Sequence, residues 1–154
     1  MEKLNLPEYD FRIRKNNGKL DIFDDFRKKF VALTPEEWVR QNFIMYLVNE
    51  KDYPGSLIAV EGGLKLYNRI KRTDIVVYNN KGNPVLIVEC KAPDVKITQS
   101  VFDQIARYNI ALKVDYLIVT NGIYHYCCFI NYLDDSITYL KDIPNYKNLL
   151  TSNK

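Results

Sequence analysis

One stretch, Val85–Lys91, constrains the fold of this 154-residue chain more than any other. It reads Val-Leu-Ile-Val-Glu-Cys-Lys, so an apolar, mostly β-branched run leads directly into a carboxylate, a thiol and an ammonium group. A continuous apolar run of this length is typical of a strand buried on both faces. Burying charge is costly, so a charged pair at the end of such a strand suggests a functional role. Because side chains alternate along a strand, Glu89 and Lys91 should share one face and Cys90 the other.

The segments around this strand predict a mixed α/β domain. Thr34-Pro35-Glu36-Glu37 has the residues of a helix start, and helical spacing of apolar residues continues to about residues 49–51. A second helix is expected over about residues 98–112, with Ser100 and Asp103 as a capping box. It separates two apolar strands, which favours a parallel crossover, whereas the other links favour hairpins. Strands are expected over residues 56–60, 73–78, 85–90, 116–120 and 124–130, and residues 64–71 are ambiguous.

The two ends of the chain carry weaker signals. Residues 9–23 predict a hairpin around an Asn-Asn-Gly turn, and the charged residues 24–31 predict a loop or a short helical turn. The tail predicts one short element before a frayed end. With no repeat or linker, residues 1–154 are expected to form a single domain with its core at about residues 34–130.

Composition limits the function classes. The net charge of +3 permits nucleic-acid binding without arguing for it. The three cysteines are odd in number, two are adjacent, and all lie in apolar stretches, which predicts free buried thiols and a reducing cytoplasm. The one histidine leaves no Cys/His metal-ligand spacing. No signal peptide or membrane-length apolar run is found, so a cytoplasmic protein without a membrane partner is expected.

Strand register supplies a second carboxylate. The turn between residues 73–78 and 85–90 is centred near position 81 or 82, and antiparallel partners keep a constant number sum. Asp74 should therefore lie opposite about residues 88–90, beside Glu89. Two carboxylates that close repel each other unless a cation or a proton lies between them, and Mg²⁺ typically takes one or two carboxylates. Lys91 could then neutralise charge at a phosphate or at the attacking water. The alternative is a surface ion pair among these three side chains.

The residues around Asp74 and Glu89 resemble the motif of a known protein superfamily. Asp74, Glu89, Cys90 and Lys91 match the D…(D/E)-x-K signature of the PD-(D/E)xK nuclease superfamily. The text Arg72-Thr73-Asp74-Ile75-Val76-Val77 followed by Ile87-Val88-Glu89-Cys90-Lys91-Ala92-Pro93 resembles the N-terminal nuclease domain of type I restriction enzyme R subunits. Gln104 and Tyr108 have the spacing of the Gln-x-x-x-Tyr motif found in RecB-like members. Residues 34–41 resemble the first helix of the family, in which Glu37 is the candidate acid.

The resemblance implies a restriction-endonuclease-like fold, a mixed β-sheet flanked by helices. It implies Mg²⁺, with Mn²⁺ as a substitute, bound by Asp74, Glu89 and the backbone carbonyl of Cys90, with Glu37 as a further candidate. Lys91 would orient or deprotonate the attacking water. Gln104 and Tyr108 would support the catalytic residues or contact DNA.

The chain departs from the family in two places. Thr73 replaces the proline that often precedes the aspartate, and no G-x-x-x-x-G-K-[ST] loop is present. A complete restriction subunit is therefore not expected. The alternatives are a stand-alone protein, a remnant, or a component of another system, in which a motor or specificity subunit could be encoded separately. One active site cuts one strand, so a double-strand cut would need a homodimer or two turnovers.

Several other residues keep two interpretations. Arg69, Lys71 and Arg72 could line a phosphate path or form a solvated face. Glu61 could be an additional acidic ligand or a solvated turn residue. Tyr67 could stack on a base or pack, and His125 is expected to be a strand residue without a catalytic role. Cys90 and Cys127 are expected to pack as small apolar groups.

The sequence thus predicts a Mg²⁺-dependent DNA endonuclease. The alternatives are a nucleic-acid-binding module that no longer cuts and a partner-binding module with the same fold.

Overall fold

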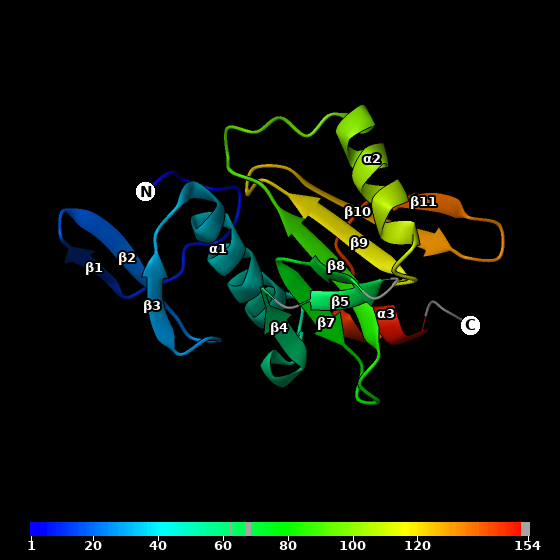
Figure 1. The fold of residues 1–154 in the computed structure, drawn as a ribbon, viewed down its shortest axis with the longest axis horizontal. Coiled ribbons are helices and arrows are strands. Elements are labelled where there is room, and N and C mark those ends of the chain that lie inside the picture. The colour runs from blue at the N-terminus through cyan, green and yellow to red at the C-terminus, as the bar shows by residue number, and fades with distance from the viewer. Residues whose placement is uncertain (62, 67–68, 152–154) are drawn as a thin grey trace.

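The computed structural model of the chain describes residues 1–61, 63–66 and 69–151, with the backbone alone for residues 63–66, 69–72 and 151. Within these residues, six strands form one sheet in the order β11-β10-β9-β8-β7-β4 (Figure 1). The pair β8–β9 is parallel, and the remaining neighbours are antiparallel. This is the mixed sheet that the sequence predicts. The strands are β4 (Ile58–Val60), β7 (Ile75–Tyr78), β8 (Pro84–Cys90), β9 (Tyr116–Thr120), β10 (His125–Asn131) and β11 (Ser136–Leu140).

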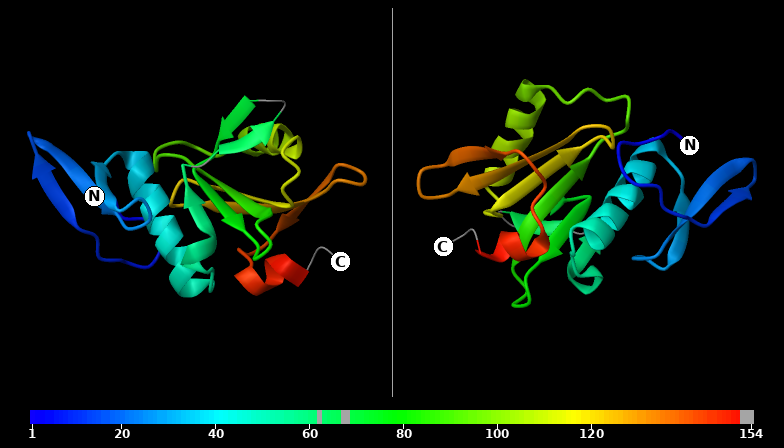
Figure 2. Two further views of the ribbon diagram at one scale, coloured as in Figure 1. Left: turned by 60° about the horizontal axis from the view of Figure 1, so that its bottom comes forward. Right: turned by 180° about the vertical axis from the view of Figure 1, so that it is seen from behind.

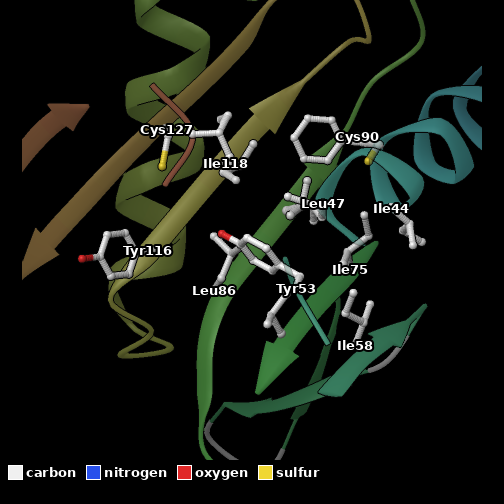
Figure 3. Packing of buried hydrophobic residues seen from close by; sticks show 14 of the residues in the cluster. Ile44, Leu47, Tyr53, Ile58, Ile75, Leu86, Cys90, Tyr116, Ile118 and Cys127 are labelled. Carbon is white, nitrogen blue, oxygen red and sulfur yellow. The ribbon is translucent and has the colours of Figure 1, made fainter. Parts of the chain in front are cut away.

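Helices cover both faces of the sheet. The apolar side of α1 (Pro35–Glu50) packs in one buried cluster with Leu86 and Val88 of β8. On the opposite face, α2 (Gln99–Ile110) packs against Ile87. This alternation along β8 is why the strand is apolar throughout its central residues. Figure 3 shows the α1 cluster, which also holds the Cys90 and Cys127 side chains.

Both long helices begin after a threonine whose hydroxyl caps the first turn. The Thr34 hydroxyl accepts a hydrogen bond from the Glu37 backbone N–H at 3.0 Å, as the sequence predicts for the start of α1. At α2 the prediction of Ser100 as the cap is wrong by two residues. Thr98 is the N-cap, and its hydroxyl accepts from the Val101 N–H at 3.2 Å. Either hydroxyl satisfies the pattern locally, and the extended backbone at Thr98 decides the outcome.

The N-terminal region forms a second sheet that lies beyond α1, drawn in blue at one end of the molecule (Figure 2). Its strands are β1 (Ile13–Asn16), β2 (Lys19–Asp24) and β3 (Lys29–Ala32). The prediction of a loop or helical turn at residues 24–31 is therefore wrong for β3. The Asp24 carboxylate accepts hydrogen bonds from the Phe26 and Arg27 N–H groups at 2.8 and 3.2 Å, which closes a tight turn that local propensity does not reveal.

The described parts of the ambiguous segment and of the tail form regular elements. Residues 64–66 belong to β5 (Gly63–Leu66) and residues 69–71 to β6 (Arg69–Arg72), and the two strands pair antiparallel. A short 3-10 helix, η1 (Gly55–Leu57), precedes β4. The tail forms two elements where one was predicted, the edge strand β11 and α3 (Tyr146–Thr151), which is anchored by the fully buried Leu149.

All three cysteines are buried and free, as their sequence context predicts. Burial raises the pKa of the Cys128 thiol to about 12, so this thiol stays protonated at neutral pH. None of the helices among the described residues is long and apolar enough to span a bilayer.

Candidate active site

The β7–β8 ladder brings Asp74 and Glu89 together. Ile75 pairs with Val88, so one further step along the ladder places Asp74 opposite Glu89. The Asp74 Oδ2 atom accepts a hydrogen bond from the Cys90 backbone N–H at 2.7 Å, which fixes its carboxylate against β8. The register that the sequence predicts from the turn is thus confirmed.

A third acidic residue extends this row on the other side. Val60 pairs with Ile75 across β4 and β7, and the Glu61 N–H donates to the Asp74 carbonyl at 3.0 Å. Glu61, Asp74 and Glu89 are consequently neighbours across three adjacent strands. Nothing in the local sequence places Glu61 beside Asp74, because the link depends on the β4–β7 pairing.

The face on which the charged end of β8 lies follows from its neighbours. Cys90 packs in the cluster under α1, and Ile87 packs in the cluster under α2. Alternation therefore places Glu89 and Lys91 on the α2 side, both partly exposed. The Lys91 N–H donates to the Thr120 carbonyl at 2.8 Å, which extends the β8–β9 pairing and fixes the lysine backbone at the sheet edge.

Burial and charge make Asp74 an unusual carboxylate. Its pKa is raised from 3.8, chiefly by burial and further by the negative charges of Glu89 and Glu36. The Cys90 N–H and the positive charge of Arg40 act in the opposite direction. A carboxyl group in such surroundings gains from a nearby cation, because the cation relieves both the desolvation and the repulsion.

Asp74 opens into a polar cavity of about 280 Å³ between the sheet edge, the start of α1 and strand β3. Glu36, in the first turn of α1, lines this cavity and is exposed. The predicted site does not include Glu36, because Glu37 is the acid selected from the same turn. The cavity is lined by Arg27, Val31, Ala32, Thr34, Glu36, Glu37, Arg40, Glu61 and Asp74.

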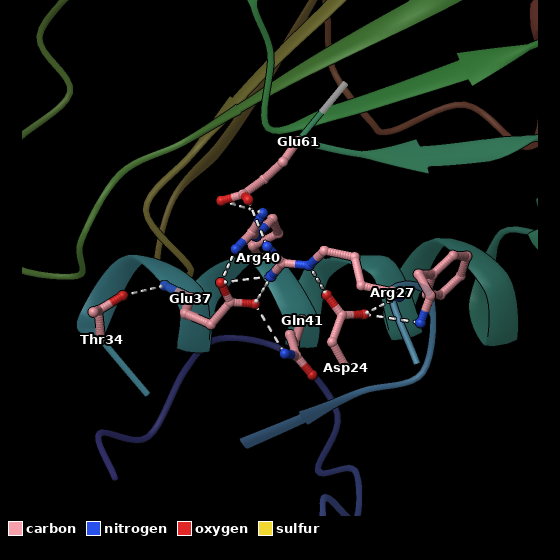
Figure 4. Close-up of polar contacts among 8 residues, drawn as sticks. Asp24, Arg27, Thr34, Glu37, Arg40, Gln41 and Glu61 are labelled. Atoms are coloured by element: carbon pink, nitrogen blue, oxygen red, sulfur yellow. Dashed lines mark hydrogen bonds and ion pairs between the residues drawn. The ribbon is translucent and has the colours of Figure 1, made fainter. Parts of the chain in front are cut away.

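Glu37 lies at the centre of a buried ion-pair network (Figure 4). Its carboxylate contacts the Arg40 guanidinium, and both of its oxygens lie 3.1 Å from Arg27 Nη2. The Gln41 amide donates to Glu37 Oε2 at 2.9 Å. Glu37 and Arg40 are each 5% exposed, so this network is sheltered from water.

The same two arginines hold Glu61 and the turn before β3. Arg27 Nη1 lies 2.5 Å and Arg40 Nη1 lies 2.9 Å from the Glu61 carboxylate. Arg27 Nε contacts Asp24 Oδ2 at 2.5 Å. The network therefore ties α1, the end of β4 and the N-terminal sheet together beside Asp74. Glu61 is exposed at the end of β4, which agrees with the solvated interpretation, and its carboxylate is also paired with two arginines.

The arginines of this network are functional neighbours that sequence reasoning missed. The spacing of Glu37, Arg40 and Gln41 places them on one helix face, so a charged face at the start of α1 could have been noticed. Arg27 and Glu61 come from distant segments and have no local signal.

Gln104 and Tyr108 lie one turn apart on the exposed part of α2. The opposite flank of α2 faces β11, where Gln99 Nε2 contacts the Tyr139 hydroxyl at 2.8 Å. Tyr108 follows Gln99 by nine residues, which is about 180° around the helix. Tyr108 is therefore on the flank away from β11, toward β8, with 57% of its surface exposed.

Other predicted residues fall in two groups. The side chains of Arg69, Lys71 and Arg72, and residue Tyr67, lie outside the described residues. His125 is a β10 residue whose ring is held by the Thr120 hydroxyl at 2.7 Å and the Asn5 carbonyl at 3.0 Å, and burial lowers its pKa. The His125 ring also lies beside the Phe43 and Tyr46 rings of α1, with centroid distances of 5.4 and 6.3 Å.

The donor set can be compared with what different metals need. Among the described residues, no three His, Cys, Asp or Glu side chains are grouped as metal ligands. A closed zinc-type site of side chains therefore does not occur in that part of the chain. Mg²⁺ requires fewer protein ligands, because it retains waters and takes substrate phosphate oxygens. Asp74 and Glu89 fit this requirement.

The Cys90 carbonyl completes a suitable oxygen set. The N–H and C=O of one residue in an extended strand point toward the same neighbour. Since the Cys90 N–H reaches Asp74 and the Lys91 N–H reaches β9, the Cys90 carbonyl is directed toward the Asp74 side of β8. There it is beyond the last pair of the β7–β8 ladder, Ile75 with Val88.

Comparisons with known proteins agree with this architecture. The chain is similar to a fragment structure assigned to an HsdR subunit of a type I restriction enzyme from Vibrio vulnificus YJ016, with 19% identity and a TM-score of 0.52. The similarity covers 78% of this chain but 25% of that one, so the chain spans about a quarter of the HsdR fragment. No curated protein matches the chain significantly. A sequence model of the type I restriction enzyme R protein N terminus matches residues 35–144, and the chain therefore belongs to that family.

Proposed function

We propose that this chain is a Mg²⁺-dependent endonuclease that hydrolyses DNA phosphodiester bonds. The observation that carries the proposal is the position of Asp74, one step beyond the Ile75–Val88 pair and therefore opposite Glu89. Burial and the neighbouring Glu89 carboxylate raise the pKa of Asp74, which also lines a polar cavity. Carboxylates that are held close together despite desolvation and mutual repulsion are typical of cation-binding sites. Lys91 follows Glu89 on the same face and adds a positive charge where a phosphate would lie.

Each residue has a defined part in the proposed reaction. Asp74 and Glu89 would hold Mg²⁺ together with the Cys90 carbonyl. When bound, the metal supplies a more acidic water and neutralises charge that develops on the phosphate. Lys91 would orient the attacking water and stabilise the same negative charge. The Cys90 N–H keeps the Asp74 carboxylate in place, so little reorganisation is needed.

The roles of the remaining predicted residues follow from their positions. Gln104 and Tyr108, on the flank of α2 away from β11, would contact DNA or support Lys91. Glu36 replaces Glu37 as the first-helix acid nearest to a bound cation, because the Glu37 carboxylate is engaged by two arginines. A double-strand cut would need two copies of the chain or two turnovers, and the wider restriction system would supply a motor and a specificity subunit.

A specific observation also favours a second candidate, a binding module that does not cut. The Arg40 charge lowers the pKa of Asp74 and so supplies part of the positive charge that a metal would otherwise provide. A site neutralised in this way could retain its fold and DNA contacts without Mg²⁺.

A plasmid-nicking assay separates the two candidates. The wild-type chain with Mg²⁺ or Mn²⁺ should convert supercoiled plasmid to the open circular form, and EDTA should stop the reaction. Lys91→Ala should lower the rate by about 100-fold or more, because it removes a charge that stabilises the transition state. Retention of the full rate in Lys91→Ala would show that the chemistry lies elsewhere, and absence of nicking by the wild type would favour the binding module.

A further inference from the structure

The N-terminal sheet contains an excess of positive charge and lies outside the part of the chain that matches the family. Residues 12–32 hold seven basic and three acidic residues, whereas the whole chain has 22 and 19. The remainder of the chain is therefore slightly acidic. The family match begins at residue 35, after the last strand of this sheet. The basic N-terminal sheet therefore lies outside the matched residues 35–144.

Strand register sorts these charges by face. Arg14 pairs with Asp21, and Asn16 with Lys19, so their side chains lie on the same side of β1 and β2. The Phe23 N–H donates to the Arg12 carbonyl at 2.8 Å, which extends the ladder and adds Arg12 to that side. Phe23 and Phe30 are paired across β2 and β3 and complete it. We call the side defined by Arg12, Arg14, Lys19, Phe23 and Phe30 the basic face.

Two aromatic rings support the arginines of the basic face. The Arg12 guanidinium lies 4.6 Å from the Phe23 ring centroid, and the Arg14 guanidinium lies 4.0 Å from that of Phe30. The two rings pack edge to face at 5.2 Å. A guanidinium that stacks on a ring is held in position while its N–H edge stays available to a phosphate. Asp21 contacts Arg14 at 3.2 Å, which leaves the face with a net positive charge.

The basic face borders the cavity of the candidate active site. Ala32, which pairs with Asp21 on this side of the sheet, lines the cavity that also contains Asp74. From there the sheet extends away past α1, as both views of Figure 2 show. Strands of this length span about 15–20 Å, which corresponds to about five phosphates along one DNA strand. Arg12, Arg14 and Lys19 are all exposed along this path.

We propose that the basic face of the N-terminal sheet binds the phosphate backbone of duplex DNA several base pairs from the phosphate at Asp74 and Glu89. The location relative to the cut rests on the proposed function, whereas the binding itself does not. Because the basic face is positively charged, its expected ligand is a polyanion. The regular spacing of the cations along the strands matches the regular spacing of phosphates in a duplex backbone.

The test compares two triple variants of the full chain in EDTA, so that the DNA remains intact. Binding to a fluorescent 30-base-pair duplex is measured by anisotropy from 50 to 300 mM salt. Arg12→Gln/Arg14→Gln/Lys19→Gln removes the charge of the basic face. The matched control, Lys81→Gln/Lys113→Gln/Lys141→Gln, removes the same charge from exposed positions outside the N-terminal sheet: the β7–β8 turn, the α2–β9 connection and the residue after β11.

The basic-face triple variant should bind about 100-fold more weakly near 150 mM salt, and the slope of log K against log salt should become less steep by about three. The control should change neither quantity by more than a small factor. Arg12→Lys/Arg14→Lys keeps the charge and should retain the wild-type salt slope. This conservative variant also shows that a loss in the glutamine variant does not arise from an altered sheet.

Three outcomes would overturn the proposal: wild-type and basic-face variant affinities that agree within twofold, no binding of duplex DNA by the wild type, or equal binding of an acidic polypeptide. The last would indicate a surface for an acidic protein. The proposed function fails separately, since a wild-type chain that binds DNA but never nicks it removes the nuclease and leaves the basic face in place.

Discussion

Two sets of carboxylates have opposite electrostatic surroundings. Glu37, Glu61 and Asp74 line one cavity, and Glu89 lies opposite Asp74 on β8. Glu37 and Glu61 are neutralised by Arg27 and Arg40, with contacts from both arginines to both acids. Asp74, one strand from Glu61, is instead raised in pKa by burial and by Glu89. The first set stabilises the wall of the cavity, whereas a bound cation would lower the electrostatic cost of the second set. The difference indicates which carboxylate is the better candidate for a metal site. It is the one whose surroundings disfavour its negative charge, and the number of nearby acids is a weaker guide.

The largest expected effect is on catalysis. Glu89→Gln should reduce plasmid nicking by about 1000-fold, because it removes a metal ligand and weakens charge stabilisation in the transition state. Circular dichroism should show the wild-type fold. The exposed Asp142→Asn serves as the control and should keep the wild-type rate. Nicking by Glu89→Gln at more than a tenth of the wild-type rate would remove Glu89 from the site.

Substitutions in the arginine-paired set, Glu37 and Glu61, should change the stability of the fold. Arg40→Gln leaves the buried Glu37 carboxylate with Arg27 as its remaining arginine, and Glu61 likewise loses one of two arginines. Breaking a buried ion pair in this way should lower the free energy of unfolding by about 3 kcal/mol, measured by urea titration. A change below about 0.5 kcal/mol would place this network among weak surface pairs, and the comparison between the two sets would lose its basis.

Substitution of Asp74 should change the free energy of unfolding in the opposite direction to Arg40→Gln. Because its pKa is raised in the folded state, the protonated form favours folding, and the stability that protonation gives is lost as pH rises through the folded-state pKa. At pH 7 the ionised carboxylate therefore destabilises the metal-free chain. Asp74→Asn should be more stable than the wild type at pH 7 in EDTA, since an amide oxygen can still accept from the Cys90 N–H.

The advantage of Asp74→Asn should shrink as pH falls and vanish below the ordinary aspartate value of 3.8, where the wild-type group is protonated in both states. Urea unfolding from pH 7 to pH 3.5 measures this trend. A less stable Asp74→Asn at pH 7 would mean that the aspartate is already satisfied by positive charge, as the binding-module alternative requires.

The smallest effect concerns the helix start that carries Glu36. Thr34→Ala removes the N-cap of α1 and should cost about 1 kcal/mol in unfolding free energy. Thr98→Ala removes the equivalent cap of α2 and should cost a similar amount. Thr34→Ala alone should also weaken nicking by a few fold, because α1 borders the cavity of Asp74. Equal nicking by both variants would separate the start of α1 from the site.

The sequence was sufficient for features that depend on local or ladder geometry. The buried strand β8, the start of α1 at Thr34 and the opposition of Asp74 and Glu89 follow from apolar runs, capping residues and a turn centre. The identity of the family followed from short motifs in the correct order. Each of the structural signals lies within one short stretch of sequence, of which the longest runs from Asp74 to Glu89, and backbone geometry leaves few alternatives over such a stretch.

Features that depend on long-range pairing were missed. β3 forms because the Asp24 carboxylate closes the preceding turn and the strand pairs with β2, although residues 24–29 are mostly charged. Arg27 and Glu61 meet across 34 residues, so no window of sequence shows that they neutralise each other. Glu37 and Glu36 look equivalent in sequence, and tertiary contacts alone place one in the ion-pair network and leave the other exposed in the cavity.

The central claim is that Asp74 and Glu89 bind a metal ion. The most direct test measures Mn²⁺ binding to the full chain by calorimetry and by the shift in melting temperature. The wild type should bind Mn²⁺ and become more stable as the metal concentration rises. Asp74→Asn and Glu89→Gln should each lose this response, whereas Glu61→Gln should retain it, because the Glu61 carboxylate is paired with two arginines. Undiminished Mn²⁺ binding in the Asp74→Asn/Glu89→Gln double variant, or loss of binding in Glu61→Gln alone, would contradict the assignment of the metal to Asp74 and Glu89.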